Sequence, residues 1–212
     1  MPQPSPLPED AVRRPLERYG LSVTTAQVEQ IRAYISLLLV WNEKVNITSI
    51  RDPREILYRH FCESMLAKAL VPIEKGRLAD VGSGGGFPGL PLKIISPDIE
   101  VFLIESNTKK ATFLAEVVRE LGLTGVRVLV QRHEDLGEEI APVDFVCTRA
   151  LGAFDLLLSW ATSRLLAVKS VVLWVGAAEV TKLAHQAGWT WRDPVPVPDS
   201  LRRFLLVGDR AS

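Results

Sequence analysis

The sequence is poor in the residues that build disulfide frameworks and metal sites. It contains 2 cysteines and 3 histidines among 212 residues. Cys62 and Cys147 belong to no C-x-x-C motif, and the histidines lack the spacings typical of metal ligands. One disulfide is possible, but the pattern favours a reduced intracellular protein with no metal site.

The sequence also lacks long apolar runs and an excess of charge of either sign. Its first residues do not resemble a signal peptide, and the longest early apolar run, 37–41, is far too short to span a bilayer. We therefore expect a cytoplasmic protein without a membrane partner. The 25 basic and 25 acidic residues give a formal net charge of zero. This balance argues against a protein that coats nucleic acid through bulk charge.

What is present predicts an α/β protein in two parts. The length and the 47% hydrophobic content suit one full core. Residues 1–8 are proline-rich and predicted to be frayed or disordered. The rest of 1–75 shows helical spacing, as at Val28, Ile31 and Ile35, and predicts an N-terminal cap of three helices.

Residues 76–212 alternate between short apolar segments and helical ones, which indicates a parallel sheet buried on both faces. The predicted strands are 77–81, 100–105, 126–130, 143–147 and 170–175. The predicted helices are about 88–95, 109–121 and 153–165. Segments 188–197 and 201–207 predict an antiparallel pair at one sheet edge.

The most informative motif is the glycine-rich segment 80–89, Asp-Val-Gly-Ser-Gly-Gly-Gly-Phe-Pro-Gly, at the turn from the first strand into the first helix. The segment matches two overlapping patterns. One is G-x-G-x-x-G, which begins at Gly84, and the other is an acidic residue followed by x-G-x-G-x-G, which begins at Asp80. In a dinucleotide site the first glycine follows the strand at once, beside the pyrophosphate. Here Gly84 comes later, and Asp80 would repel a pyrophosphate. A ligand with an amino group and a sulfonium suits Asp80 better.

The next two strand ends support S-adenosylmethionine over NAD as the cofactor. Glu105 ends the second strand, where a carboxylate can accept both ribose hydroxyls, and 131–135 follows the third. All three tyrosines precede the glycine loop, so short-chain dehydrogenase chemistry has no catalyst. The candidate cofactor-binding residues are Asp80, Gly82, Ser83, Gly84, Gly86, Phe87, Glu105, Arg132, His133 and Glu134.

Several strings together resemble one known family, across about residues 26–208. They are Trp41-Asn42-Glu43-Lys44-Val45-Asn46-Ile47-Thr48, Arg51-Asp52-Pro53, Arg59-His60, the glycine loop extended through Leu90-Pro91-Leu92, Arg132 with Glu134, and Thr148-Arg149-Ala150. The chain resembles the bacterial guanine-N7 methyltransferases of small-subunit ribosomal RNA, also called glucose-inhibited division protein B.

The resemblance implies a Rossmann-like, seven-stranded, mostly parallel methyltransferase sheet with a helical cap. It implies methyl transfer from S-adenosylmethionine to N7 of one guanosine in the 16S rRNA decoding region. The implied partner is the small ribosomal subunit or an assembly intermediate, and the protein is expected to bind it as a monomer. By the same matching, Asn46 and Arg149 are catalytic candidates, and Arg132, Arg149 and Arg203 are RNA-binding candidates. Arg149 is also a candidate cofactor-binding residue on this ground.

Guanine N7 carries a free lone pair, so in-line attack on the methyl group needs no general base. The sequence departs from the family after the fifth strand, where Leu173-Trp174-Val175-Gly176 lacks the lysine of the usual Leu-Lys-Gly. Two alternatives therefore stay open: a methyltransferase of this fold with another RNA or a small molecule as substrate, and a cofactor-binding regulator without turnover.

Four further residues have two interpretations each. Cys147 ends the fourth strand, where a C5-methyltransferase would place its nucleophile, but it lacks the usual preceding proline, and a buried strand residue is favoured. His60 is favoured as a satisfied core histidine over a target contact. Trp189 and Trp191 are favoured as packing residues over RNA-stacking ones.

Overall fold

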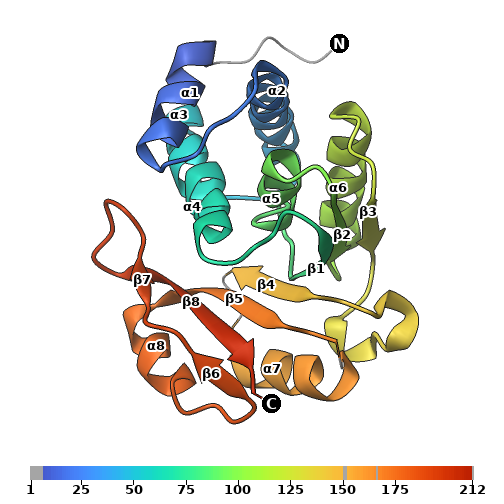
Figure 1. The fold of residues 1–212 in the computed structure, drawn as a ribbon. Helices are drawn as coiled ribbons and strands as arrows, with labels where there is room; N and C mark the ends of the chain where they lie inside the picture. The colour runs from blue at the N-terminus through green and yellow to red at the C-terminus, as the bar shows by residue number, and fades with distance from the viewer. Residues whose placement is uncertain (1–6, 150–151, 166, 212) are drawn as a thin grey trace.

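One mixed sheet runs through the molecule (Figure 1). The structure, a computed structural model, describes residues 7–149, 152–165 and 167–211. The strand order is β3-β2-β1-β4-β5-β8-β6, and β7 pairs with β8 off this path. The strands are β1 (Gly76–Val81), β2 (Ile99–Ile104), β3 (Val126–Leu129), β4 (Phe145–Arg149), β5 (Ser170–Gly176), β6 (Trp189–Trp191), β7 (Val195–Pro196) and β8 (Arg203–Arg210).

The pairing confirms the predicted fold class. Strands β1 to β5 are parallel, whereas β8 runs antiparallel to β5 and carries β6 and β7. The implied strand count of seven is corrected to eight within the described residues, because the two-residue β7 adds to β8. The antiparallel direction of β8 matters for the site, since it places Arg203 opposite Gly176, at the edge where the parallel strands end.

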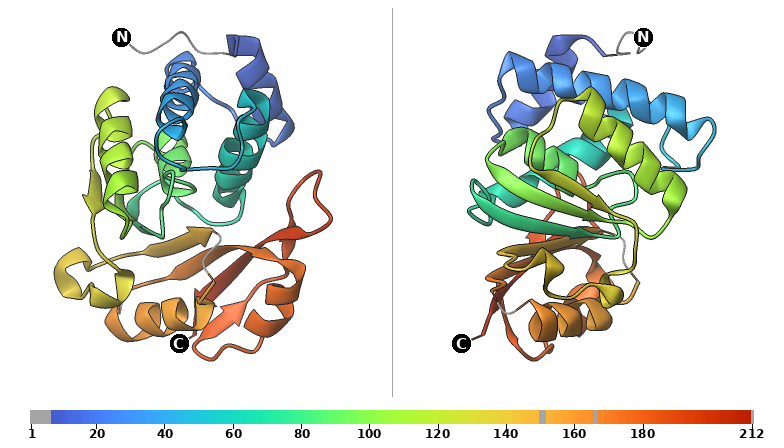
Figure 2. Two further views of the ribbon diagram at one scale, coloured as in Figure 1. Left: turned by 180° about the vertical axis from the view of Figure 1, so that it is seen from behind. Right: turned by 90° about the vertical axis from the view of Figure 1, so that its right-hand side faces the viewer.

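Helices cover both faces of the sheet, as the two views of Figure 2 show. Helices α5 (Gly89–Ile95) and α6 (Thr108–Glu120) share a face and a hydrophobic cluster with the helices of the N-terminal part. Helices α7 (Phe154–Arg164) and α8 (Ala177–Leu183) belong to the cluster on the other face. Helix α8 was not predicted from the sequence.

The N-terminal part contains the three predicted helices. They are α1 (Glu9–Arg18), α2 (Thr25–Asn42) and a continuous helical stretch made of α3 (Pro53–Ile56), the π-helical η1 (Leu57–Cys62), α4 (Glu63–Met65) and the 3₁₀-helical η2 (Leu66–Ala69). Thr24 and Gln27 form a capping box at the start of α2, and Asp52 caps α3. A π-helical turn is rare and is frequent at functional sites.

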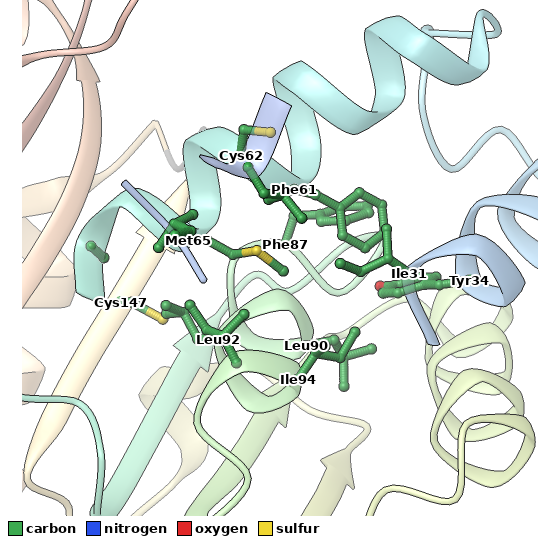
Figure 3. Close-up of a cluster of buried hydrophobic side chains, with 14 of the residues drawn as sticks. Ile31, Tyr34, Phe61, Cys62, Met65, Phe87, Leu90, Leu92, Ile94 and Cys147 are labelled. Atoms are coloured by element: carbon green, nitrogen blue, oxygen red, sulfur yellow. The ribbon is translucent and has the colours of Figure 1, made fainter. Parts of the chain in front are cut away.

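The N-terminal helices and the sheet share one core rather than meeting at a separable interface. Figure 3 shows Phe61 of η1 and Phe87 of the glycine loop close together, with Tyr34 of α2 beside them. Tyr34 stacks on Phe87 at 5.4 Å between ring centroids and meets Phe61 edge-on at 5.1 Å. This aromatic group therefore joins the helices to the loop that follows β1.

The N-terminal prediction of disorder needs a correction at its end. Residues 1–6 lie outside the described residues, but Leu7 is buried and its carbonyl accepts a hydrogen bond from Arg32 at 2.8 Å. No helix within the described ranges combines the length and apolar character that crossing a membrane requires.

Candidate functional site

The glycine loop after β1 is a tight turn held by its own backbone. Gly82, Gly84 and Gly86 have positive φ angles of 70°, 56° and 84°, a region that favours glycine. The N–H groups of Gly82 and Ser83 donate to the Ile104 carbonyl at 2.9 and 3.1 Å, which ties the loop to the end of β2. The loop is thus fixed at the carboxyl edge of β1 and β2, where α/β sheets bind ligands.

Asp80 lies buried beneath this loop. Its side chain is fully buried, and Oδ2 accepts the Gly89 N–H at 3.0 Å at the start of α5. Burial raises the pKa of Asp80 to about 7. The other oxygen, Oδ1, has no hydrogen-bond partner among the described residues. Asp80 therefore joins β1 to α5, a contact that the sequence did not indicate.

Three other predicted cofactor residues make structural contacts, and their role toward the cofactor stays a prediction. The Ser83 hydroxyl donates to the Asp80 carbonyl at 2.8 Å. Gly86 faces α2, because a Cβ there would collide with the Tyr34 hydroxyl. Phe87 is buried between the rings of Tyr34 and His60. Of the residues described, these three line neither of the two cavities below, because the motif identifies the loop but not which of its faces the helices cover.

A first cavity of about 190 Å³ lies where β1, β2 and β3 end. Five of the predicted cofactor residues meet there. Its lining consists of Val81, Gly82, Ile104, Glu105, Ser106, Gln131, Arg132, His133, Glu134 and Ala153. Gly84 borders this region through its N–H, which donates to Glu105 Oε2 at 2.8 Å.

The carboxylate of Glu105 is already oriented by backbone donors. Oε2 accepts from Gly84 and Oε1 accepts from the Asn107 N–H at 2.8 Å. A carboxylate oxygen has two lone pairs, so each oxygen keeps one for a hydroxyl in the cavity.

His133 also lines the first cavity, and its protonation state follows from its surroundings. Burial lowers its pKa, so the ring is neutral near pH 7. Its Nδ1 lies 3.0 Å from Glu134 Oε2, whereas Nε2 is buried without a partner among the described residues. The wall therefore offers an oriented acceptor pair at Glu105 and an uncommitted ring nitrogen at His133.

A second cavity of about 330 Å³ lies at the ends of β4 and β5 and the start of β8, and the π-helical turn closes it. Its lining consists of Ile50, Arg59, His60, Glu63, Arg149, Trp174, Val175, Gly176 and Arg203. The predicted Arg149 and Arg203 both lie here. So does Val175, the position at which the family's lysine is missing.

Arg149 connects β4 to the π-helical turn. Its guanidinium donates to the Arg59 carbonyl at 2.6 Å and to Nδ1 of His60, and it lies 5.7 Å from the centre of the Phe87 ring. Burial lowers the pKa of Arg149 to about 10, so the side chain stays charged at pH 7.

His60 is satisfied, as favoured, yet it also lines the second cavity. Its Nδ1 accepts from Arg149, and Nε2 lies 2.8 Å from the Thr48 hydroxyl, which assigns the ring proton to Nε2. Burial and the charges of Arg149 and Arg59 lower the pKa of His60 to about 3. The ring is therefore neutral at physiological pH and serves to position Arg149.

Glu63 is a site residue that sequence reasoning missed. Its side chain is only 5% exposed, and Oε1 accepts from Arg203 at 2.8 Å and lies 3.3 Å from Nε of Arg59. Burial raises its pKa, whereas the charges of Arg203, Arg149 and Arg59 act in the opposite direction. The i, i+4 spacing from Arg59 was the only signal in the sequence.

Asn46 is exposed in the loop after α2 and, among the described residues, lines neither cavity. The loop is held instead by Asn42, whose Oδ1 accepts from the N–H groups of Ile47 and Thr48 at 2.9 and 3.0 Å. Ile47 lies against the glycine loop, 2.9 Å from where a Cβ on Gly85 would be. The catalytic role of Asn46 stays a prediction.

The remaining residues follow the favoured interpretations. Cys147 is fully buried, and burial with the nearby Asp80 raises its pKa well above the usual range. Trp189 packs in the cluster under α7 and α8, and Trp191 lies against Gly208. The described residues hold no group of His, Cys, Asp and Glu side chains suited to a metal ion.

Comparison with known proteins decides the family. A family model described as rRNA small subunit methyltransferase G matches residues 27–188. The chain belongs to this family.

Named members of the rRNA small subunit methyltransferase G family are similar over much of the chain. The proteins of Desulfitobacterium hafniense (strain Y51) and Xylella fastidiosa (strain M23) are 40% and 49% identical over 148 and 140 residues. These alignments cover 68% and 65% of this chain but 61% and 65% of the relatives, so the chain spans less than two thirds of their length. The Pseudomonas fluorescens (strain Pf0-1) protein is 38% identical, with 72% of each chain covered.

Solved structures with low sequence identity share the fold. A SAM-dependent methyltransferase from Aquifex aeolicus superimposes with a TM-score of 0.60 and 20% identity, covering 78% of this chain and 97% of that one. A chain of a fibrillarin/Nop5p complex superimposes with a TM-score of 0.59 and 16% identity, covering 73% of this chain and 82% of that one. These comparisons show that this chain shares the fold of both structures.

Proposed function

We propose that this protein transfers a methyl group from S-adenosylmethionine to N7 of a guanosine in the decoding region of 16S rRNA. The observation that carries the proposal is the pair of cavities at one sheet edge. The first is lined by carboxylate and loop residues suited to a nucleoside, and the second is lined by three arginines. Family membership supplies the rRNA substrate class.

The residues of the first cavity fit S-adenosylmethionine. Glu105 keeps two lone pairs for the ribose hydroxyls, and the 131–134 loop with His133 would lie beside the adenine. In its ionised form, the buried Asp80 carboxylate, whose Oδ1 has no partner among the described residues, would favour the cationic end of the ligand from beneath the loop. When bound, S-adenosylmethionine supplies a methyl group activated by its positively charged sulfur.

The second cavity would receive the target guanosine. N7 attacks with its own lone pair, so the residues act by positioning and electrostatics. A guanidinium bound to N7 would block the reaction, so we assign Arg149 and Arg203 to flanking phosphates, sugars or base faces. Arg132, at the first cavity, would hold RNA or cofactor there. Asn46 lies in the exposed loop that Asn42 anchors, and it would contact the target from that loop.

We further propose that residues 1–75 act as a cap and 76–212 as the cofactor-binding part. The natural substrate would be the small ribosomal subunit or an assembly intermediate, and the protein would bind it as a monomer in the bacterial cytoplasm. A folded particle would supply the contacts that a protein of zero net charge does not provide.

The test is methyl transfer by the purified protein to small ribosomal subunits from a strain that lacks this modification. We expect labelled methyl groups at a single N7-methylguanosine in the decoding region, mapped by mass spectrometry. Arg149→Ala should lower kcat/KM at least about tenfold because it loses the contacts to the Arg59 carbonyl and His60. Arg77→Ala, which removes a surface pair with Glu100, is the control. Absence of transfer, or methylation at another atom, contradicts the proposal.

A further inference from the structure

The second cavity contains a buried carboxylate that the proposed reaction does not use. Glu63 is 4% exposed, yet it lines the cavity. Oε1 accepts one hydrogen bond, from Arg203, and Nε of Arg59 lies 3.3 Å from the same oxygen without forming a hydrogen bond, so Oε1 keeps a lone pair. Oε2 makes no hydrogen bond to any described residue. The charges of two neighbouring arginines favour the ionised form of this carboxylate, inside a cavity of about 330 Å³.

We propose that Glu63 selects guanine by accepting hydrogen bonds from its N1–H and N2 amino group. This inference rests on the proposed function and names the residue that specifies the base. Guanine carries two adjacent donors on its Watson–Crick edge, and a carboxylate carries two adjacent acceptors. Adenine presents a lone pair at N1 and no amino group at C2, so the N1–C2 part of its edge would face the carboxylate without a donor.

The chemistry of the target agrees with this arrangement. N7 and the Watson–Crick edge lie on opposite sides of the purine, so a guanine held by Glu63 leaves N7 free. Enzymes that act on a base commonly read its Watson–Crick edge after drawing it out of the stack. Arg203 stays bound to Oε1 and orients the carboxylate, which makes it a positioning residue for Glu63.

The first experiment changes only the RNA. A 16S rRNA with guanosine or inosine at the methylated position is made by splinted ligation and assembled into small subunits. Inosine retains N7 and N1–H but lacks the N2 amino group. Loss of one hydrogen bond to a charged group predicts a kcat/KM about 10- to 100-fold lower for inosine. Equal rates overturn the inference alone, whereas no transfer to guanosine removes the proposed function and the inference together.

The second experiment crosses this change with Glu63→Gln. If Glu63 reads the amino group, the guanosine-to-inosine ratio falls toward one in the variant. A purely structural role would lower both rates equally and preserve the wild-type ratio, which overturns the inference. Glu55→Gln is the matched control, since Glu55 also pairs with Arg59, at 3.6 Å, from the surface. The inosine comparison stands on wild type even if Glu63→Gln does not fold.

Discussion

At the scale of single residues, Asp80 shows how burial sets the pH dependence of stability. Its folded pKa of about 7 lies above the ordinary 3.8. Between about pH 4 and 7 the folded state therefore holds a proton that the unfolded state releases. By linkage, this group makes the protein less stable as the pH rises through that window.

Asp80→Asn removes this titration and keeps an oxygen that can accept the Gly89 N–H. We expect the variant to gain stability relative to wild type as pH rises from about 4 to 7, at up to roughly 1.4 kcal/mol per pH unit. Urea unfolding across pH 4–8 measures it. The opposite contribution of His60, whose pKa is lowered to about 3, is present in both proteins and cancels in the difference. A difference that does not vary with pH would show that Asp80 is ionised throughout.

Cys147 permits a second prediction at the residue scale. A buried thiol with a raised pKa forms little thiolate and reacts slowly. We expect a disulfide reagent such as DTNB to leave Cys62 and Cys147 unmodified in the native protein and to titrate both after unfolding in guanidinium chloride. Cys147→Ala should keep methyl transfer within about threefold of wild type. A large loss of transfer by a folded Cys147→Ala protein would restore the covalent alternative.

At the scale of elements, α2 controls the shape of the glycine loop. The Tyr34 hydroxyl donates to the Gly85 carbonyl, and this bond is buried. Tyr34→Phe leaves that carbonyl without a donor, so we expect a loss of about 1–3 kcal/mol in the free energy of unfolding and weaker binding of S-adenosylmethionine. Urea denaturation and isothermal titration calorimetry measure the two effects.

The matched control for Tyr34→Phe is Tyr58→Phe, because the Tyr58 hydroxyl makes no hydrogen bond to the described residues. Gly86→Ala should be more damaging than Tyr34→Phe, since it combines a φ of 84° with a collision against Tyr34 and Leu90. Unchanged ligand affinity in a stable Tyr34→Phe protein would show that the loop keeps its shape without α2.

The elements also show what local sequence can and cannot predict. Strands β1 to β3 begin within one residue of their predicted positions, because buried parallel strands appear as continuous apolar runs. Helix α8 has one fully buried residue, Leu183, and so left a weak signal. The glycine loop follows from its spacing, but its contacts with Tyr34 do not. The pairing of Glu63 with Arg203 spans 140 positions, and no local pattern encodes it.

At the scale of the whole molecule, the formal charge is zero but unevenly distributed. The segment 76–143, which supplies all of the first cavity's lining except Ala153, carries a net charge of −3, whereas 1–75 and 144–212 carry +1 and +2. A cationic cofactor would therefore lie in the acidic segment. The second cavity gathers arginines from both basic segments, although Arg59 and Arg203 are already paired with Glu63.

This distribution predicts weak, shallowly salt-dependent binding to naked rRNA. Each phosphate neutralised on single-stranded RNA contributes about −0.7 to the slope of log K against log salt concentration. Two to four arginines at the two cavities would give a slope between about −1.5 and −3. Fluorescence titration of unstructured rRNA between about 50 and 200 mM salt measures the slope, with Arg132→Ala making it shallower by about 0.7. A slope steeper than about −5 would mean that a larger basic surface contacts RNA, and the particle would then no longer be needed to supply affinity.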